Sequence, residues 1–136
     1  MNPKYMLDTN ICVYLMKYQP AAVRARFAEC FVGDVVISAV TLAELEYGVA
    51  GSGDARAHNQ ALLDSLLEDI PVEPFEARAA RAYGPLRLGY RARNKDALDK
   101  LVAAHALSLG VTLVTNNEAD FHGYAGLVVE NWVTNH

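Results

Sequence analysis

Apolar and polar positions follow one another in blocks that predict strands and helices in turn. Short apolar runs typical of buried strands stand at residues 5–7, 35–38, 111–115 and 127–129. Between them, the composition and the spacing of apolar residues predict helices over 11–16, 20–30, 41–48, 59–67, 76–88 and 94–109. The stretch 70–75 contains two prolines, so it fits an edge strand or an extended connection.

Strands that alternate with helices and are joined by short turns indicate an α/β protein. We therefore expect a three-layer α/β/α sandwich with a mostly parallel central sheet, formed by residues 1–136 as one domain. Ligands bind beyond the carboxyl ends of the strands in such sheets. Asp8, Asn116 and Asn117 stand at two of these predicted strand ends.

The composition is that of an ordinary globular protein. Hydrophobic residues make up 52% and charged residues 21% of the 136, unlike a disordered or fibrous chain. No apolar run approaches the roughly 18 residues of a membrane span, and no signal-peptide core is present. We expect a cytoplasmic protein without membrane contact. Cys12 and Cys30 form no Cys-x-x-Cys unit and are expected to be reduced, half-buried thiols.

The net charge of −4 argues against a protein that coats nucleic acid by bulk electrostatic attraction. The basic residues are nevertheless concentrated, because seven of the twelve fall between Arg78 and Lys100. They are Arg78, Arg81, Arg87, Arg91, Arg93, Lys95 and Lys100. This stretch is suited to track a phosphate backbone, although a solvated helix face explains it equally well.

Acidic and amide side chains stand at four places from which a common site could form: Asp8, Glu44, Asp99 and residues 116–120. The first two also have purely structural explanations. Asp8 is placed to cap the helix that follows it, since a carboxylate accepts hydrogen bonds from free helix amides. Glu44 stands three residues after Thr41, which is the spacing of a capping box.

Asp99 is more informative than its neighbours. Three, four and seven residues further along the predicted helix stand a valine and two alanines, so the face around Asp99 is apolar. An acid on a half-buried face must be paired or must bind a cation, because an uncompensated buried charge is unfavourable. Asp96 instead has Lys100 four residues on and is typical of an exposed ion pair.

Three other polar residues keep two explanations each. His105 follows Asp99 by six residues and points elsewhere on the helix, which favours a hydrogen-bonded core histidine over a ligand. Asn117 is either a turn residue or a holder of metal or water, and Asp120 is either a loop cap or a further member of the site. Oxygen ligands without a histidine or cysteine partner suit Mg²⁺ or Mn²⁺ rather than zinc. Such an ion would allow a carboxylate site to cut a phosphodiester.

Five motifs in order along the chain resemble the PIN-domain ribonucleases, and most closely the VapC toxins of bacterial toxin–antitoxin pairs. These motifs are Met6–Ile11; Ile37–Ser38 with Thr41–Leu45 and Gly48; Asp99–Ala106; Leu113–Asn117 with Asp120–Phe121; and Gly126–Leu127 with Glu130–Trp132. The resemblance implies a metal-dependent endoribonuclease toxin whose substrate is tRNA. It also implies a partner VapB antitoxin that neutralises the toxin, and a homodimer.

Carried over by position, Asp8, Glu44 and Asp99 match the three core acids that bind Mg²⁺ or Mn²⁺ in this family. Asn117 takes a place often held by a fourth acid, and Asp120 matches an acid that some members use. By the same resemblance, these five residues form the catalytic site. Thr9 is expected to orient Asp8 or a metal-bound water.

The sequence departs from the family pattern in two places. Asn117 removes a charge, which disfavours a second metal, and residues 91–98 lack the usual turn before Asp99.

Two other functions are alternatives to a ribonuclease. Haloacid-dehalogenase-like phosphatases also begin with an acid at a strand end, but they need a second Asp where this chain has Asn10. A PIN-like scaffold that only binds RNA or antitoxin is the non-enzymatic alternative.

Overall fold

Short strands alternate with helices along the chain in the computed structural model, which describes residues 2–18, 20–89, 97–121 and 123–133. The strands are β1 (Tyr5–Leu7), β2 (Val35–Ser38), β3 (Val72–Glu73), β4 (Thr112–Val114) and β5 (Val129–Glu130). The helices are α1 (Thr9–Lys17), α2 (Ala21–Ala28), α3 (Ala39–Ala50), α4 (Arg56–Asp69), α5 (Ala77–Gly89), α6 (Ala97–Leu109) and α7 (Glu118–Phe121). A 3₁₀ turn, Gly53–Ala55, leads into α4.

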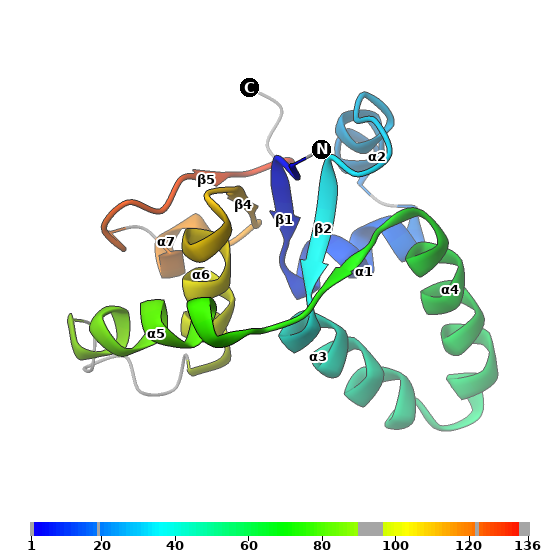
Figure 1. The fold of residues 1–136 in the computed structure, drawn as a ribbon. Helices are drawn as coiled ribbons and strands as arrows, with labels where there is room; N and C mark the ends of the chain where they lie inside the picture. Colours follow the sequence, from blue (N-terminus) through cyan, green and yellow to red (C-terminus); the bar gives the residue numbers. More distant parts are fainter. Residues whose placement is uncertain (1, 19, 90–96, 122, 134–136) are drawn as a thin grey trace.

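The strands form one sheet in the order β3-β2-β1-β4-β5, and every neighbouring pair is parallel. Tyr5 of β1 is paired with Val35 on one side and with Thr112 on the other. β1 therefore lies at the centre of the sheet, as Figure 1 shows for its place beside β2 and β4. The predicted α/β fold with a mostly parallel sheet is confirmed.

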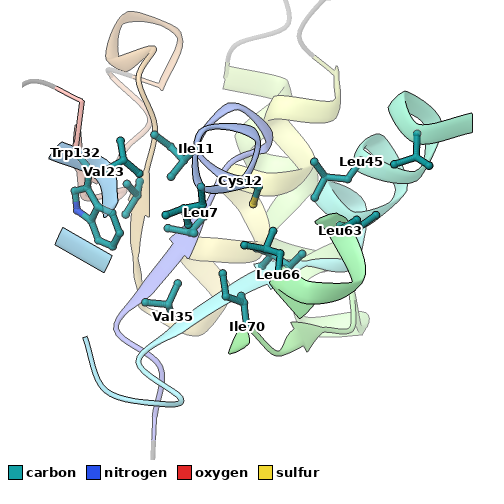
Figure 2. Packing of buried hydrophobic residues seen from close by; sticks show 14 residues of the cluster. Leu7, Ile11, Cys12, Val23, Val35, Leu45, Leu63, Leu66, Ile70 and Trp132 are labelled. Atoms are coloured by element: carbon teal, nitrogen blue, oxygen red, sulfur yellow. The ribbon is translucent and has the colours of Figure 1, made fainter. Parts of the chain in front are cut away.

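A hydrophobic core covers each face of the sheet. Successive residues of a strand point to opposite faces, so Leu7 packs in one core and Met6 in the other. The first core joins the sheet to α1, α2 and α4, and Figure 2 shows Leu7 among Ile11, Cys12 and Leu66. The second core joins it to α5, α6 and α7. Helices on both faces give the three layers that the sequence predicts.

Most predicted elements are present, with differences at their ends. The proline-containing stretch 70–75 supplies β3, which lies at the edge of the sheet where a missing amide proton is tolerated. Gly110 ends α6 with a φ of 68°, a conformation that glycine adopts without strain. The short helix α7 is not among the predicted elements, because four residues carry too little periodicity to reveal it.

The thiols and the core histidine are placed as structural groups. His105 is 2% exposed and its Nδ1 lies 2.8 Å from the Ser38 hydroxyl, which confirms a hydrogen-bonded core residue. Cys12 and Cys30 are both free thiols, as predicted, but Cys12 is completely buried rather than half-buried. No helix in the described part of the chain is long and apolar enough to cross a membrane.

Candidate active site

The connections between strands lead to opposite sides of β1, and this creates a crevice at the carboxyl end of that strand. From β1 the chain goes to β2 on one side, while β4 enters on the other side. Ligands bind at such a switch point in parallel sheets. Asp8 follows β1 here, and Thr115 to Asn117 follow β4. The two strand ends are tied together, because the Asp8 amide donates to the Val114 carbonyl at 3.0 Å.

Asp8 both caps α1 and faces a pocket. Its Oδ1 accepts the Ile11 amide proton at 3.0 Å, so the capping explanation is correct. The same carboxyl also lines a cavity of about 160 Å³ together with Glu44 and Asp99. Burial raises the pKa of Asp8, as does the nearby charge of Glu44, while hydrogen bonds from Thr115 and Ile11 oppose the rise. This ionised carboxylate is therefore in an unfavourable place unless a cation accompanies it.

Glu44 reaches the pocket from α3, and the capping-box explanation for it is wrong. Helix α3 begins at Ala39, and its cap is Ser38, whose hydroxyl accepts the Val40 amide at 3.0 Å. The predicted start at Thr41 is thus two residues late. Glu44 instead accepts a hydrogen bond from Thr9 Oγ1 at 2.8 Å. Thr9, expected to orient Asp8 or a water, holds Glu44 in this structure.

Asp99 lies in the first turn of α6, half-buried beside Val102 in the pocket wall. Its position confirms that it stands on an apolar face. The expectation of an exposed ion pair at Lys100 is wrong, since Lys100 is only 1% exposed. Its expected partner Asp96 lies outside the described residues. The tight packing of small side chains along α6 is what brings Asp99 close to the sheet edge.

Asn117 lines the pocket, whereas Asp120 is not among the lining residues. Asn117 Nδ2 donates to Asp120 Oδ2, and the Asn117 amide donates to Thr115 Oγ1 at 3.0 Å. Phe121, 2% exposed, anchors α7 below them. Asp120 therefore acts on the pocket through Asn117 in this arrangement.

Sequence reasoning missed the part that Asn10 and Thr115 play at this edge, whereas Asn116 is among the predicted residues. Asn10 lines the pocket and donates to Asn116 Oδ1 at 3.3 Å, and Asn116 donates to the Tyr14 hydroxyl at 2.9 Å. Thr115 is completely buried and bonds both Asp8 and Asn117. A threonine at the end of an apolar strand is the signal that would have identified it.

The donor set fits a hard divalent cation without forming a complete site. Three carboxylates and an amide, all oxygen donors, suit Mg²⁺ or Mn²⁺. However, no three His, Cys, Asp or Glu side chains in the described ranges are gathered closely enough to bind a metal by themselves. A cation here would take the rest of its ligands from the amide, from water or from a substrate, or would draw the carboxylates together.

The basic stretch is only partly placed on the surface. Arg78, Arg81 and Arg87 are exposed on α5. Arg87 donates to the Tyr83 hydroxyl at 2.8 Å. Lys100 is buried, and Arg91, Arg93 and Lys95 lie outside the described residues. The role of this stretch in holding a phosphate backbone stays a prediction.

Known proteins share this sequence and this fold. Residues 5–127 match the family described as PIN domain. The chain is 40% identical to the tRNA(fMet)-specific endonuclease VapC of Shigella flexneri over 131 residues, which cover 95% of this chain and 98% of that protein. It is 37% identical to ribonuclease VapC2 of Rickettsia felis, over 94% of this chain and 97% of the relative.

Solved structures agree with these relatives. VapBC2 from Rickettsia felis, bound to a DNA fragment from its promoter, superposes with a TM-score of 0.85 at 36% identity, covering 94% of this chain and 98% of that one. DNA-bound VapBC from Salmonella typhimurium gives a TM-score of 0.87 at 32% identity, covering 96% and 98%.

Proposed function

The chain belongs to the PIN-domain family, and within it to the VapC ribonucleases, and we propose that it is an endoribonuclease toxin that uses Mg²⁺ or Mn²⁺. The observation that carries the proposal is the shared pocket of Asp8, Glu44 and Asp99, which arrive from three separate elements at one sheet edge. Three acids in one half-buried pocket repel one another and favour a divalent cation.

The residues of the pocket would have different roles in binding that cation. Asp8, Glu44 and Asp99 would ligate it, and Asn117 would complete the shell with its amide oxygen. When bound by these residues, such an ion would supply a water of lowered pKa and positive charge opposite the phosphate. Thr9 fixes the Glu44 carboxylate, while Thr115 hydrogen-bonds Asp8. Asp120 orients the Asn117 amide through their hydrogen bond.

We propose tRNA as the substrate. The endonucleases VapC of Shigella flexneri and Salmonella typhimurium are named as specific for tRNA(fMet), and the initiator tRNA is therefore the first substrate to test. The exposed arginines of α5 offer a cationic surface for its phosphates.

We further propose that a VapB antitoxin neutralises the chain in the cytoplasm and that the toxin forms a homodimer. Similar proteins have been solved as VapBC complexes. A groove of about 480 Å³ between α1, α2 and α4 offers the antitoxin an apolar surface that includes Leu15, Phe27 and Leu66. Among the described residues, none lines both this groove and the carboxylate pocket.

The test of the proposed function is the Asp8→Asn variant. It should lose Mn²⁺-dependent cleavage of tRNA and no longer arrest growth when it is expressed. Asp64→Asn is the matched control, because Asp64 is exposed on α4 and lines none of the pocket. Undiminished cleavage by Asp8→Asn would refute the assignment of the site.

Two alternatives are separated by further assays. A scaffold without activity should bind no Mn²⁺ at the acidic pocket in a calorimetric titration, whereas an enzyme should. Membership of the PIN-domain family leaves the phosphatase alternative without support, and hydrolysis of a phosphate monoester is not expected.

A further inference from the structure

A second hollow lies directly beside the carboxylate pocket. It has a volume of about 250 Å³ and is lined by residues of α1, α3 and α4. Figure 1 shows the arrangement of these three helices. Thr9 and Glu44, joined by their hydrogen bond, line both hollows. A molecule held at the carboxylates can therefore place its next chemical group in this second hollow.

The walls of the second hollow are aliphatic and one side of it is kept open by a glycine. Val13, Leu45 and Leu62 contribute the apolar walls from three different helices. At Gly48 of α3, an added Cβ would meet no atom of the described residues within 4 Å. Glycine in a helix interior destabilises the helix relative to alanine, and no close approach of another element requires it here. The missing side chain leaves room between aliphatic surfaces, which suits the flat face of an aromatic ring.

Two polar side chains at the hollow, Asn59 and Lys17, make no hydrogen bond or salt bridge with the described residues. Asn59 is half-buried, and within the described ranges its side-chain amide makes no hydrogen bond. Lys17 is exposed at the end of α1 and forms no salt bridge with a described residue. An asparagine amide offers a donor and an acceptor side by side, which matches the edge of a nucleobase. A lysine ammonium attracts a phosphate.

We propose that this hollow binds the nucleobase next to the cleaved phosphodiester and gives the enzyme its preference for the base at that position. The aliphatic walls hold the face of the base, Asn59 reads its edge, and Lys17 contacts the neighbouring phosphate. This mode suits an unstacked base of a single-stranded RNA segment. The proposal rests on the ribonuclease function proposed above. An apolar side chain of a protein partner would also fill the walls, but it would leave Asn59 and Lys17 unused.

The test compares cleavage of RNAs that differ only in the bases flanking the mapped cleavage site. For the wild type, we expect kcat/KM to differ by about tenfold between the best and the worst base, as one well-placed edge contact allows. Gly48→Leu fills the hollow, so kcat/KM for the best base should fall to that for the worst. Asn59→Ala should reduce the same difference. Ala50→Leu is the control, because Ala50 is exposed on the same helix and is not among the lining residues.

Each outcome has a distinct meaning. A Gly48→Leu protein that unfolds at the wild-type temperature and retains the wild-type base preference overturns the proposal. So does a Gly48→Leu protein that binds VapB antitoxin more weakly while its base preference is unchanged, since the hollow would then serve the protein partner. Wild-type cleavage of tRNA at rates independent of the flanking base overturns the nucleobase site alone. Absence of any RNA cleavage by the wild type overturns the proposed function as well.

Discussion

Asp8→Asn replaces a carboxylate by an amide of nearly the same shape at the centre of the pocket. Asparagine caps helices about as well as aspartate, so the hydrogen bond from the Ile11 amide should be kept. What changes is the charge. Because burial and the nearby Glu44 raise the pKa of Asp8, the ionised carboxylate destabilises the metal-free folded protein at neutral pH. We therefore expect the inactive variant to be more stable than the wild type.

The expected gain is about 1–2 kcal/mol in the free energy of unfolding, which lies within the range of about 0.5–2 kcal/mol that single stabilising substitutions commonly give. For a chain of this size it corresponds to a rise in Tm of about 3–6 °C. The sign depends on pH. A pKa raised in the folded state means that folded Asp8 takes up its proton before unfolded Asp8 does. As the pH falls through the pKa of folded Asp8 and towards the ordinary value of 3.8, the carboxylate becomes protonated and no longer destabilises the folded wild type. The difference in the free energy of unfolding between wild type and Asp8→Asn then disappears.

The assay is urea unfolding of both proteins in EDTA and in excess Mn²⁺. In EDTA at about pH 7, Asp8→Asn should be the more stable protein. With Mn²⁺ at a hundredfold its Kd, the wild type should gain about 2.7 kcal/mol and the order should reverse. Asp64→Asn should change neither the free energy of unfolding in EDTA nor the stabilisation by Mn²⁺. Equal stability of Asp8→Asn and wild type in EDTA, or an advantage that persists in acid, would falsify the account of Asp8 as a strained charge.

Three further predictions concern the cores. Trp132→Ala should cost about 3–5 kcal/mol in urea unfolding, because the buried indole packs against Tyr5 and donates to Glu130. Burial lowers the pKa of His105 below 6.5, so acidification should destabilise the protein as the unfolded state alone gains this proton. In His105→Gln, the slope of the free energy of unfolding against pH should therefore decrease by the equivalent of about one proton. An unchanged slope in urea unfolding measured over a range of pH would contradict this explanation. A thiol reagent should label Cys30 in the native protein and Cys12 only after unfolding, since burial raises the pKa of Cys12. Mass spectrometry measures the labelling, and simultaneous labelling of both thiols in the native protein would contradict the prediction.

The sequence was sufficient to predict the fold where the pattern reports burial. The strands at 5–7 and 35–38 have the predicted bounds because each is a short apolar run with a turn or cap after it. Asp99 could be selected over Asp96 because its helical neighbours are small and apolar. These features depend on local spacing, which is what a sequence displays directly.

Features that depend on which helices meet were not predictable. Ser38 and Thr41 both stand at plausible starts of α3, and only the packing of the helix shows that Ser38 is the cap. Lys100 has the spacing of an exposed ion pair, yet its helix is enclosed between the sheet and α5. Asp120 lies one hydrogen bond away from the pocket because α7 turns it towards Asn117, and so short a helix leaves no periodic signal.

The order of the strands also sets when the site comes into existence during synthesis. β1 and β2 can pair early, but β4 can pair with β1 only after residues 112–114 have been made. The pocket around Asp8 stays incomplete until Thr115 and Asn117 have been synthesised, more than one hundred residues later. A partly synthesised chain holds Asp8 and Glu44 without Asp99 or the β4 edge. Nascent and truncated chains therefore lack the assembled pocket, and any harm to the cell begins only with nearly complete molecules.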